Sequence, residues 1–169
     1  MSEPEGLWQF SLRVYAAPGV AEWCLAQQDG LGADVNILLW AAWRGAGGRR
    51  LAPADLAAAE AATAPWRDGV VRPLRAARRA MRGDLGAIGA AAAAELRRRA
   101  KALELEAERL QQSALEQLRL GGTAVEGVPR EPVVAANLVL CLDRLGAAET
   151  APPPALIAAA VTGTCNTCL

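Results

Sequence analysis

The cysteines are the first residues of this chain that could do chemistry. Cys165 and Cys168 stand near the C-terminus at a spacing with which two thiols can share a metal ion or form a strained disulfide. Cys24 and Cys141 could add two further thiolates, but the chain holds no second pair at this spacing. We therefore predict an inert tail, no cofactor and no metal centre, with redox or metal chemistry at Cys165 and Cys168 as the weaker alternative.

The absence of histidine narrows the remaining chemistry. It excludes Ser-His-Asp triads and histidine metal sites, which are common means of catalysis near neutral pH. Oxygen-bearing side chains do gather at Gln28, Asp29, Asp34 and Asn36, beside glycines, but their spacing matches no calcium-binding loop. Capping and loop-closing hydrogen bonds are the better interpretation, with Asp34 as a helix N-cap. We predict no catalytic residue, and these observations favour a protein that is not an enzyme.

A cluster of arginines is the strongest candidate for a binding surface. Nine of the 18 Lys and Arg residues lie between positions 72 and 101, against two acidic residues, so a chain of zero net charge has a local charge of +7 there. Helical spacing places Arg72, Arg75, Arg79 and Arg82 on one face, with Arg78 adjoining. Such a face can bind RNA, anionic lipid or an acidic protein. The interpretation that we favour is an ordinary solvated face, neutralised by the acidic distal part of the long helix, because no aromatic residue interleaves with these arginines as base stacking requires.

Aromatic residues are concentrated near the N-terminus. The segment from Leu7 to Trp43 holds four of the five tryptophans together with the single phenylalanine and tyrosine. Aromatic side chains provide large contact areas, so this segment is expected to form a specific core, or to line a groove in part. Trp8, Trp40 and Trp66 are the tryptophans that we nominate for contact with a partner.

The elements that must position these residues are predicted to be helices, because apolar residues recur at helical spacing and alternating strand patterns are nearly absent. The expected fold is all-α, a single-domain bundle of about six to eight helices with one long helix. The predicted organisation is a single domain over residues 1–150, followed by a Pro/Ala-rich tail at 151–169. Within the domain we expect an aromatic helical subregion at 5–45, a basic helix at 66–82, a long helix at about 84–120 and a helix at 131–145.

Two local patterns refine this organisation. Thr63 to Pro65 is expected to separate two helices, and Pro73 should kink the second one, because its ring would clash with the carbonyl of Gly69. Along the long helix, apolar residues at three- and four-residue steps predict a hairpin or coiled-coil partner. The stripe consists of Leu85, Ile88, Ala92, Leu96, Leu103, Leu110, Ala114 and Leu118.

Several short motifs carry a family resemblance. They are Leu-Trp-x-Phe-Ser at 7–11, Tyr-x-x-Pro-Gly-Val at 15–20, Cys-Leu-x-x-Gln-Asp at 24–29 and Asp-Val-Asn-x-Leu-Leu at 34–39, with a further segment at 66–79. With these motifs the chain resembles a family of proteobacterial proteins of about this length that has no established activity. The resemblance covers roughly the first half of the chain. It implies a bacterial, cytoplasmic, all-helical protein and supplies no catalytic residue.

The function expected from these observations is that of a non-enzymatic protein binding another macromolecule. A protein partner is the first expectation, with RNA or the ribosome as the alternative through the arginine face. The acidic N-terminus lacks the basic flank of a signal peptide, and the purest apolar run, 87–94, is shorter than the ~20 residues that span a bilayer. We therefore expect a soluble cytoplasmic protein without a membrane span, and the sequence leaves its oligomeric state open.

Overall fold

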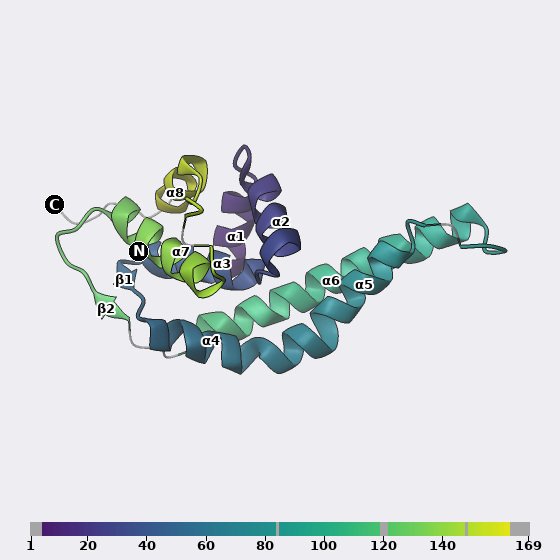
Figure 1. Ribbon diagram of the computed structural model, residues 1–169, viewed down its shortest axis with the longest axis horizontal. Coiled ribbons are helices and arrows are strands. Elements are labelled where there is room, and N and C mark those ends of the chain that lie inside the picture. The colour runs from purple at the N-terminus through teal and green to yellow at the C-terminus, as the bar shows by residue number, and fades with distance from the viewer. Residues whose placement is uncertain (1–4, 84, 119–121, 148, 163–169) are drawn as a thin grey trace.

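Helices make up nearly all of the regular structure, as the all-α prediction requires. The computed structural model describes residues 5–83, 85–118, 122–147 and 149–162 (Figure 1). In chain order the elements are α1 (Leu7–Tyr15), α2 (Val20–Leu31), α3 (Val35–Ala46), β1 (Arg49–Arg50), α4 (Pro53–Trp66), the π-helix η1 (Arg67–Val71), α5 (Arg72–Ala80), α6 (Ala90–Gln117), β2 (Thr123–Ala124), α7 (Arg130–Arg144) and α8 (Pro154–Val161).

Helix α3 is the centre of the core. Nine of its residues are buried, because α1, α2, α4, α6, α7 and α8 all contact it. Its start is set by Asp34, whose Oδ1 accepts a hydrogen bond from the backbone amide of Asn36 at 3.0 Å. This bond satisfies one of the free amides of the first turn. Trp40 lies in the middle of α3 and is 0% exposed.

The first two helices cover one side of α3. Leu7, Phe10 and Val14 form the buried face of α1, as their helical spacing predicts. The turn between α1 and α2 uses Gly19 at φ 78°, a left-handed backbone conformation that glycine adopts without steric cost. This turn lays α2 beside α1, so that the aromatic residues of the N-terminal segment surround one end of the core.

The basic segment continues a helix that starts earlier than predicted. The separation expected at Thr63 to Pro65 was wrong, because α4 runs through both residues and passes into η1 and α5 without a break. Thr63 bonds within the helix, from its hydroxyl to the carbonyl of Ala59 at 3.0 Å. The irregularity expected from Pro73 takes the form of the π turn, in which the amide of Arg72 bonds the carbonyl of Arg67, five residues back. Such a turn widens the helix just before the proline ring.

The long helix is shorter than the predicted span of 84–120. It begins at Ala90 and ends at Gln117, which gives a length of about 42 Å at 1.5 Å per residue. Gly86, at φ 60°, and Gly89 at the N-cap delay its start. Helices α5 and α6 lie side by side and extend from the body of the molecule, and we call them the arginine hairpin (Figure 1).

The seam of the arginine hairpin differs from the prediction. Ala93, Ala100 and Ala107 are buried, whereas Leu96, Leu103 and Leu110 of the expected stripe are exposed. Small alanine side chains allow two helix backbones to approach closely, and this explains why they take the inner face. The described residues include no helix of the length and apolar character that a membrane span needs.

The C-terminal part completes the core. Helix α7 packs along α3, with Val134, Leu138 and Cys141 buried. The predicted tail at 151–169 contains α8, whose Leu156 and Ala160 belong to the core. Strand signals were not evident in the sequence, yet β1 and β2 form a two-residue antiparallel pair that joins the loops before α4 and α7.

The contact between α3 and α7 depends on Gly45. A Cβ at this position would lie 2.7 Å from the Cα of Val134, closer than atoms in proteins approach. We expect Gly45→Ala to lower the free energy of unfolding by about 1 to 3 kcal/mol, although alanine favours a helix by ~1 kcal/mol. Urea denaturation would measure this change. Gly30→Ala in α2 is the control, because nothing lies within 4 Å of its Cβ position and it should leave stability equal or slightly higher. A Gly45→Ala variant as stable as the Gly30→Ala variant would contradict the close contact.

Candidate functional site

A cleft of about 590 Å³ separates the N-terminal helices from the arginine hairpin. Side chains of α1, α2 and α3 line one side, and side chains of α5 and α6 line the other. The volume falls within the ~300–1,000 Å³ range of binding pockets in proteins. This cleft brings the aromatic segment and the basic helix together, although 60 to 74 positions separate Trp8 and Tyr15 from the arginines at 75–82.

One wall of the cleft is apolar. Trp8, Leu12 and Tyr15 come from α1, Leu25 comes from α2, and Leu105 faces them from α6. Trp8 and Tyr15 are half-buried, whereas the three leucines are exposed for close to half of their surface. Exposed leucines that converge on one cleft, rather than scatter singly over the surface, indicate a contact site.

The opposite wall carries a network of two arginines and two glutamates. Arg75 Nε donates to Glu104 Oε1 at 2.8 Å, and Arg75 Nη2 donates to Glu108 Oε1 at 2.6 Å. Arg78 donates to both oxygens of Glu104, at 3.2 Å for the bond from Nη2 to Oε1 and with a shorter bond from Nε to Oε2. These bonds join α5 to α6 and use two nitrogens, Nε and Nη2, of each arginine.

The network shifts the pKa values of its two glutamates in opposite directions. Burial would raise the pKa of Glu104, but hydrogen bonds from Arg78 and Arg75 outweigh burial and lower it. Burial raises the pKa of Glu108, and its bond to Arg75 only partly offsets this effect. Glu104 therefore stays ionised to lower pH than an exposed glutamate, whereas Glu108 retains a proton to higher pH.

Most of the nominated arginines have carboxylate partners. Besides Arg75 and Arg78, Arg79 bonds Asp29 of α2 at 2.6 Å, and Arg72 bonds Asp68 at 2.8 Å. The expectation of a face open to phosphates is therefore wrong for these four residues. Sequence reasoning named the acidic distal part of the long helix as the neutralising region but not the individual pairs, because the carboxylates of three of these arginines lie 26 to 50 positions away.

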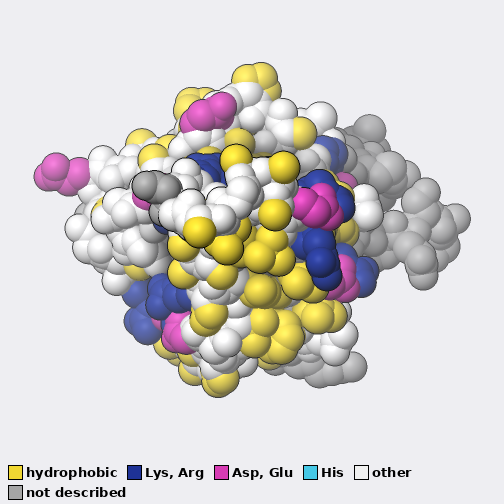
Figure 2. Space-filling model, turned by 90° about the vertical axis from the view of Figure 1, so that its right-hand side faces the viewer, with side chains coloured by type: hydrophobic (Ala, Val, Ile, Leu, Met, Phe, Trp, Pro, Cys, Tyr) yellow, Lys and Arg dark blue, Asp and Glu magenta, His cyan; other side chains and the backbone are white. Residues whose placement is uncertain are grey.

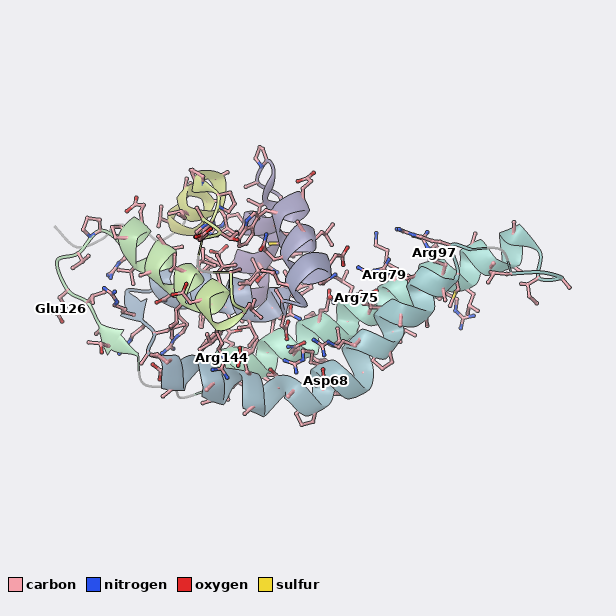
Figure 3. All side chains as sticks on the ribbon, in the orientation of Figure 1. Asp68, Arg75, Arg79, Arg97, Glu126 and Arg144 are labelled. Carbon is pink, nitrogen blue, oxygen red and sulfur yellow. The ribbon has the colours of Figure 1, made fainter. Side chains whose placement is uncertain are left out.

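Two cations of the cleft differ from the paired ones. Neither Arg82 of the loop after α5 nor Lys101 of α6 has an ion-pair partner among the described residues. In all, five cations and three carboxylates line the cleft, a formal excess of two positive charges. Figure 3 shows Arg75 and Arg79 on the side of the arginine hairpin that faces α2. An anionic group entering the cleft would meet Arg82 and Lys101 first, because they need not give up a partner.

A polar network lies beside the cleft, and two of its members, Asn36 and Gln112, line it. Gln111 Nε2 donates to Asp34 at 2.6 Å, Asn36 Nδ2 donates to Gln111 at 3.0 Å, and Gln112 Nε2 donates to Asn36 at 2.9 Å. Asp34 and Asn36 thus hold α6 against the start of α3, in addition to the capping bond. Burial raises the pKa of Asp34 despite its hydrogen bonds. Sequence reasoning missed Gln111 and Gln112, whose signal was a polar pair between apolar positions of the helix.

Two buried polar atoms beside the cleft have no hydrogen-bond partner among the described residues. They are the hydroxyl oxygen of Ser11 and Oε1 of Gln112, and both residues are almost fully buried. Buried polar atoms normally have a hydrogen-bond partner. Because neither atom is accessible from the cleft in this structure, neither adds to the surface that a ligand would contact.

The three nominated tryptophans lie in different places. Trp8 lines the cleft, whereas Trp40 lies fully buried in the core, so the nomination of Trp40 as a contact residue is wrong. The reason is that α3 is covered by helices on all sides. Trp66 is partly exposed, outside the cleft, and its Nε1 donates to the carbonyl of Ala107 at 2.9 Å, where it helps to join α4 to α6.

The cysteines within the described residues take no part in this site. Cys24 and Cys141 are free and buried, and burial raises the pKa of each thiol to about 12. A thiol with so high a pKa stays protonated and unreactive near neutral pH. Cys165 and Cys168 lie outside the described residues. Within the described part of the chain, no group of three or more metal-ligating side chains comes together.

The fold and the cleft define an all-α protein in which a compact helical core carries a projecting basic hairpin, with an apolar and cationic cleft between them. The chain belongs to the family described as protein of unknown function (DUF2390), whose model matches residues 6–115. The match spans the three N-terminal helices and most of the hairpin, so every cleft residue lies within it. No curated protein and no solved structure matches the chain.

Proposed function

We propose that this protein binds another protein, and that its cleft receives an acidic, amphipathic segment of that partner. The support is the composition of the cleft, where half-exposed leucines and two aromatic residues face a wall with excess positive charge. An amphipathic helix laid into a groove uses apolar anchors on one face and charges along its edge. Leucine or phenylalanine side chains of the partner would meet the apolar wall, and its carboxylates would meet Arg82 and Lys101.

The residues of the cleft are suited to binding rather than to a reaction. They provide apolar surface and cations, whereas the carboxylates of the network are held by arginines. We therefore propose a non-enzymatic role. A cytoplasmic location is part of the proposal, supported by the free thiols of Cys24 and Cys141, which suit a reducing compartment.

RNA is the second candidate, and one observation favours it. The fold places Trp8 and Tyr15 in the same cleft as Arg82 and Lys101, so that aromatic rings and cations lie together as in sites that bind single strands. The carboxylates bonded to Arg75, Arg78 and Arg79 leave the cleft an excess of only two positive charges, which suits one or two carboxylates better than the run of phosphates along a nucleic-acid strand. The leucines of the apolar wall also suit a protein better than a nucleic acid.

Affinity capture with cleft variants tests the proposal. Leu12→Glu, Leu105→Glu and the double variant Arg82→Glu/Lys101→Glu should each reduce the recovery of one and the same protein about tenfold or more, the effect of removing a central contact. Quantitative mass spectrometry of captures from lysate, with and without ribonuclease, measures this recovery. Circular dichroism confirms that each variant is folded.

Val139→Glu is the matched control, because Val139 is an exposed apolar residue of α7 outside the cleft. It should capture as much of the partner as the unaltered protein does. Two results would contradict the proposal. One is recovery that ribonuclease abolishes, which would indicate RNA, and the other is recovery that the cleft variants leave unchanged.

A further inference from the structure

Helix α6 carries a second apolar surface outside the cleft. Leu96, Leu103 and Leu110 stand at intervals of seven residues and are 52%, 59% and 47% exposed. We call these three residues the leucine stripe. None of them lines the cleft, and the arginine hairpin is sealed by the alanine face of α6 instead. Leucines repeated every seven residues along one helix are typical of a surface that packs against another helix.

The charges of α6 indicate which helix this would be. The first half of the helix, residues 90–103, has one acidic and four basic residues, a net charge of +3, whereas the second half, 104–117, has four acidic and one basic residue, a net charge of −3. A second copy of α6 lying parallel would place like charges together. Lys101 lines the cleft, and Glu104 and Glu108 bind arginines of α5, so the net charges left for contact with another helix are +2 in the first half and −1 in the second. An antiparallel copy would place the remaining positive charge of each helix against the remaining negative charge of the other.

We propose that two copies of this chain associate through their α6 helices, which lie antiparallel with a two-fold axis close to Leu103. In this arrangement Leu103 of each copy meets its counterpart, and Leu96 of one copy meets Leu110 of the other. A two-fold contact of this kind is self-complementary, as the symmetric distribution of leucines and charges on α6 requires.

Two exposed charges beside the leucine stripe fit the same register. Arg99 and Glu106 are seven residues apart, so they lie on the same edge of the helix, and both are exposed. About the proposed axis, Arg99 of one copy comes opposite Glu106 of the other, and the pair occurs twice. Among the described residues, Glu106 pairs with Arg109 of its own helix at 3.0 Å, and this exposed pair contributes little and can rearrange.

The extent of the surface indicates a dimer of modest strength. The leucine stripe spans about 21 Å of helix, and a stable interface usually buries about 800 Å² on each partner. Figure 2, which views the molecule from the tip of the hairpin, shows a broad area of hydrophobic side chains beside a cluster of charged ones. We expect dissociation in the micromolar range, so that monomer and dimer exchange.

Sedimentation velocity over a range of protein concentrations tests the proposal. The mass should rise with concentration from that of one chain, 17.6 kDa, towards twice this value. Leu103→Glu should remain monomeric throughout, because it places two carboxylates at the axis. Leu105→Glu is the matched control, since Leu105 is a similarly exposed leucine of α6 that faces the cleft, and it should dimerise normally. A protein that is monomeric at every concentration would overturn the proposal.

Charge reversal and cross-linking test the orientation. Arg99→Glu alone should weaken the dimer, and Arg99→Glu combined with Glu106→Arg should restore it, because the opposite charges then meet again. In a background with Cys165 and Cys168 replaced by serine, Leu103→Cys should form a disulfide-linked dimer on mild oxidation, and Leu96→Cys should not. Equal cross-linking by Leu96→Cys would indicate parallel helices and overturn the antiparallel arrangement.

Discussion

Replacing Trp40 with alanine is expected to lower the free energy of unfolding by about 3 to 5 kcal/mol, the largest effect that we expect from one substitution. Trp40 is 0% exposed and lies at the middle of α3, the helix that most other helices contact. Domains of this size are stable by about 5 to 15 kcal/mol, so much or all of the stability would be lost. Circular dichroism during urea denaturation measures the change.

Two further variants separate core packing from other effects of Trp40→Ala. Trp40→Phe keeps most of the apolar volume and sacrifices no hydrogen bond, because the indole nitrogen has no partner among the described residues. Trp40→Phe should therefore lower the free energy of unfolding by less than Trp40→Ala does. Trp8→Ala removes a half-buried ring of the cleft and should leave the protein folded. Trp40→Ala with the stability of the unaltered protein would show that α3 is not the centre of the core.

Replacing Glu104 with glutamine is expected to lower the free energy of unfolding by about 2 to 3 kcal/mol at pH 7. Removal of one member of a buried ion pair costs about 3 to 5 kcal/mol, and the value here is lower because Arg75 and Arg78 keep some contact with solvent. Glu104 holds both arginines, so its neutralisation leaves two cations undercompensated at once. Thermal denaturation followed by circular dichroism gives the difference between variant and unaltered protein.

The dependence on pH identifies charge as the cause. The pKa of Glu104 is lower in the folded protein than its ordinary value of 4.5. Its contribution to stability is therefore complete above about pH 4.5 and disappears as the pH falls through the folded-state pKa. The decrease in the free energy of unfolding caused by Glu104→Gln should therefore become smaller as the pH falls below about 4.5. If the stability difference between the variant and the unaltered protein stays constant from pH 7 to pH 3, the shape of the side chain, and not its charge, is responsible.

Glu108 is the control for this experiment, because its folded-state pKa is raised above 4.5. A raised pKa in a carboxylate means that stability falls as the pH rises from 4.5 through the folded-state value. Glu108→Gln removes the cost of burying this charge and also weakens one bond to Arg75. We therefore expect a small change at pH 7, in contrast to Glu104→Gln.

Local patterns predicted the elements of this fold well, and long-range pairing decided the rest. The cap at Asp34 and the buried face of α1 depend on residues within one or two helical turns, so sequence alone predicts them. The partners of the arginines lie on other elements, and no spacing rule connects Arg79 with Asp29. The sequence therefore predicted that the acidic half of the long helix neutralises the arginines, but it did not predict which carboxylate pairs with which arginine.

The long helix shows why a hydrophobic pattern does not identify the partner of a face. Leucines are more hydrophobic than alanines, so Leu96 and Leu103 were expected at the inner seam. Close packing of α5 against α6 favours Ala100 and Ala107 there instead. The leucines are left for other contacts, at the cleft through Leu105 and at the proposed dimer surface through the leucine stripe.

Photo-cross-linking from the cleft tests most directly the claim that the cleft receives a partner protein. A photoreactive phenylalanine derivative at position 105 should become covalently joined, in cells, to one protein that mass spectrometry identifies. The same derivative at position 139, on α7 and outside the cleft, should not be joined to that protein. The cross-link from position 105 should also disappear in the Arg82→Glu/Lys101→Glu background. No protein cross-link at position 105, or equal cross-linking from both positions, would contradict the claim.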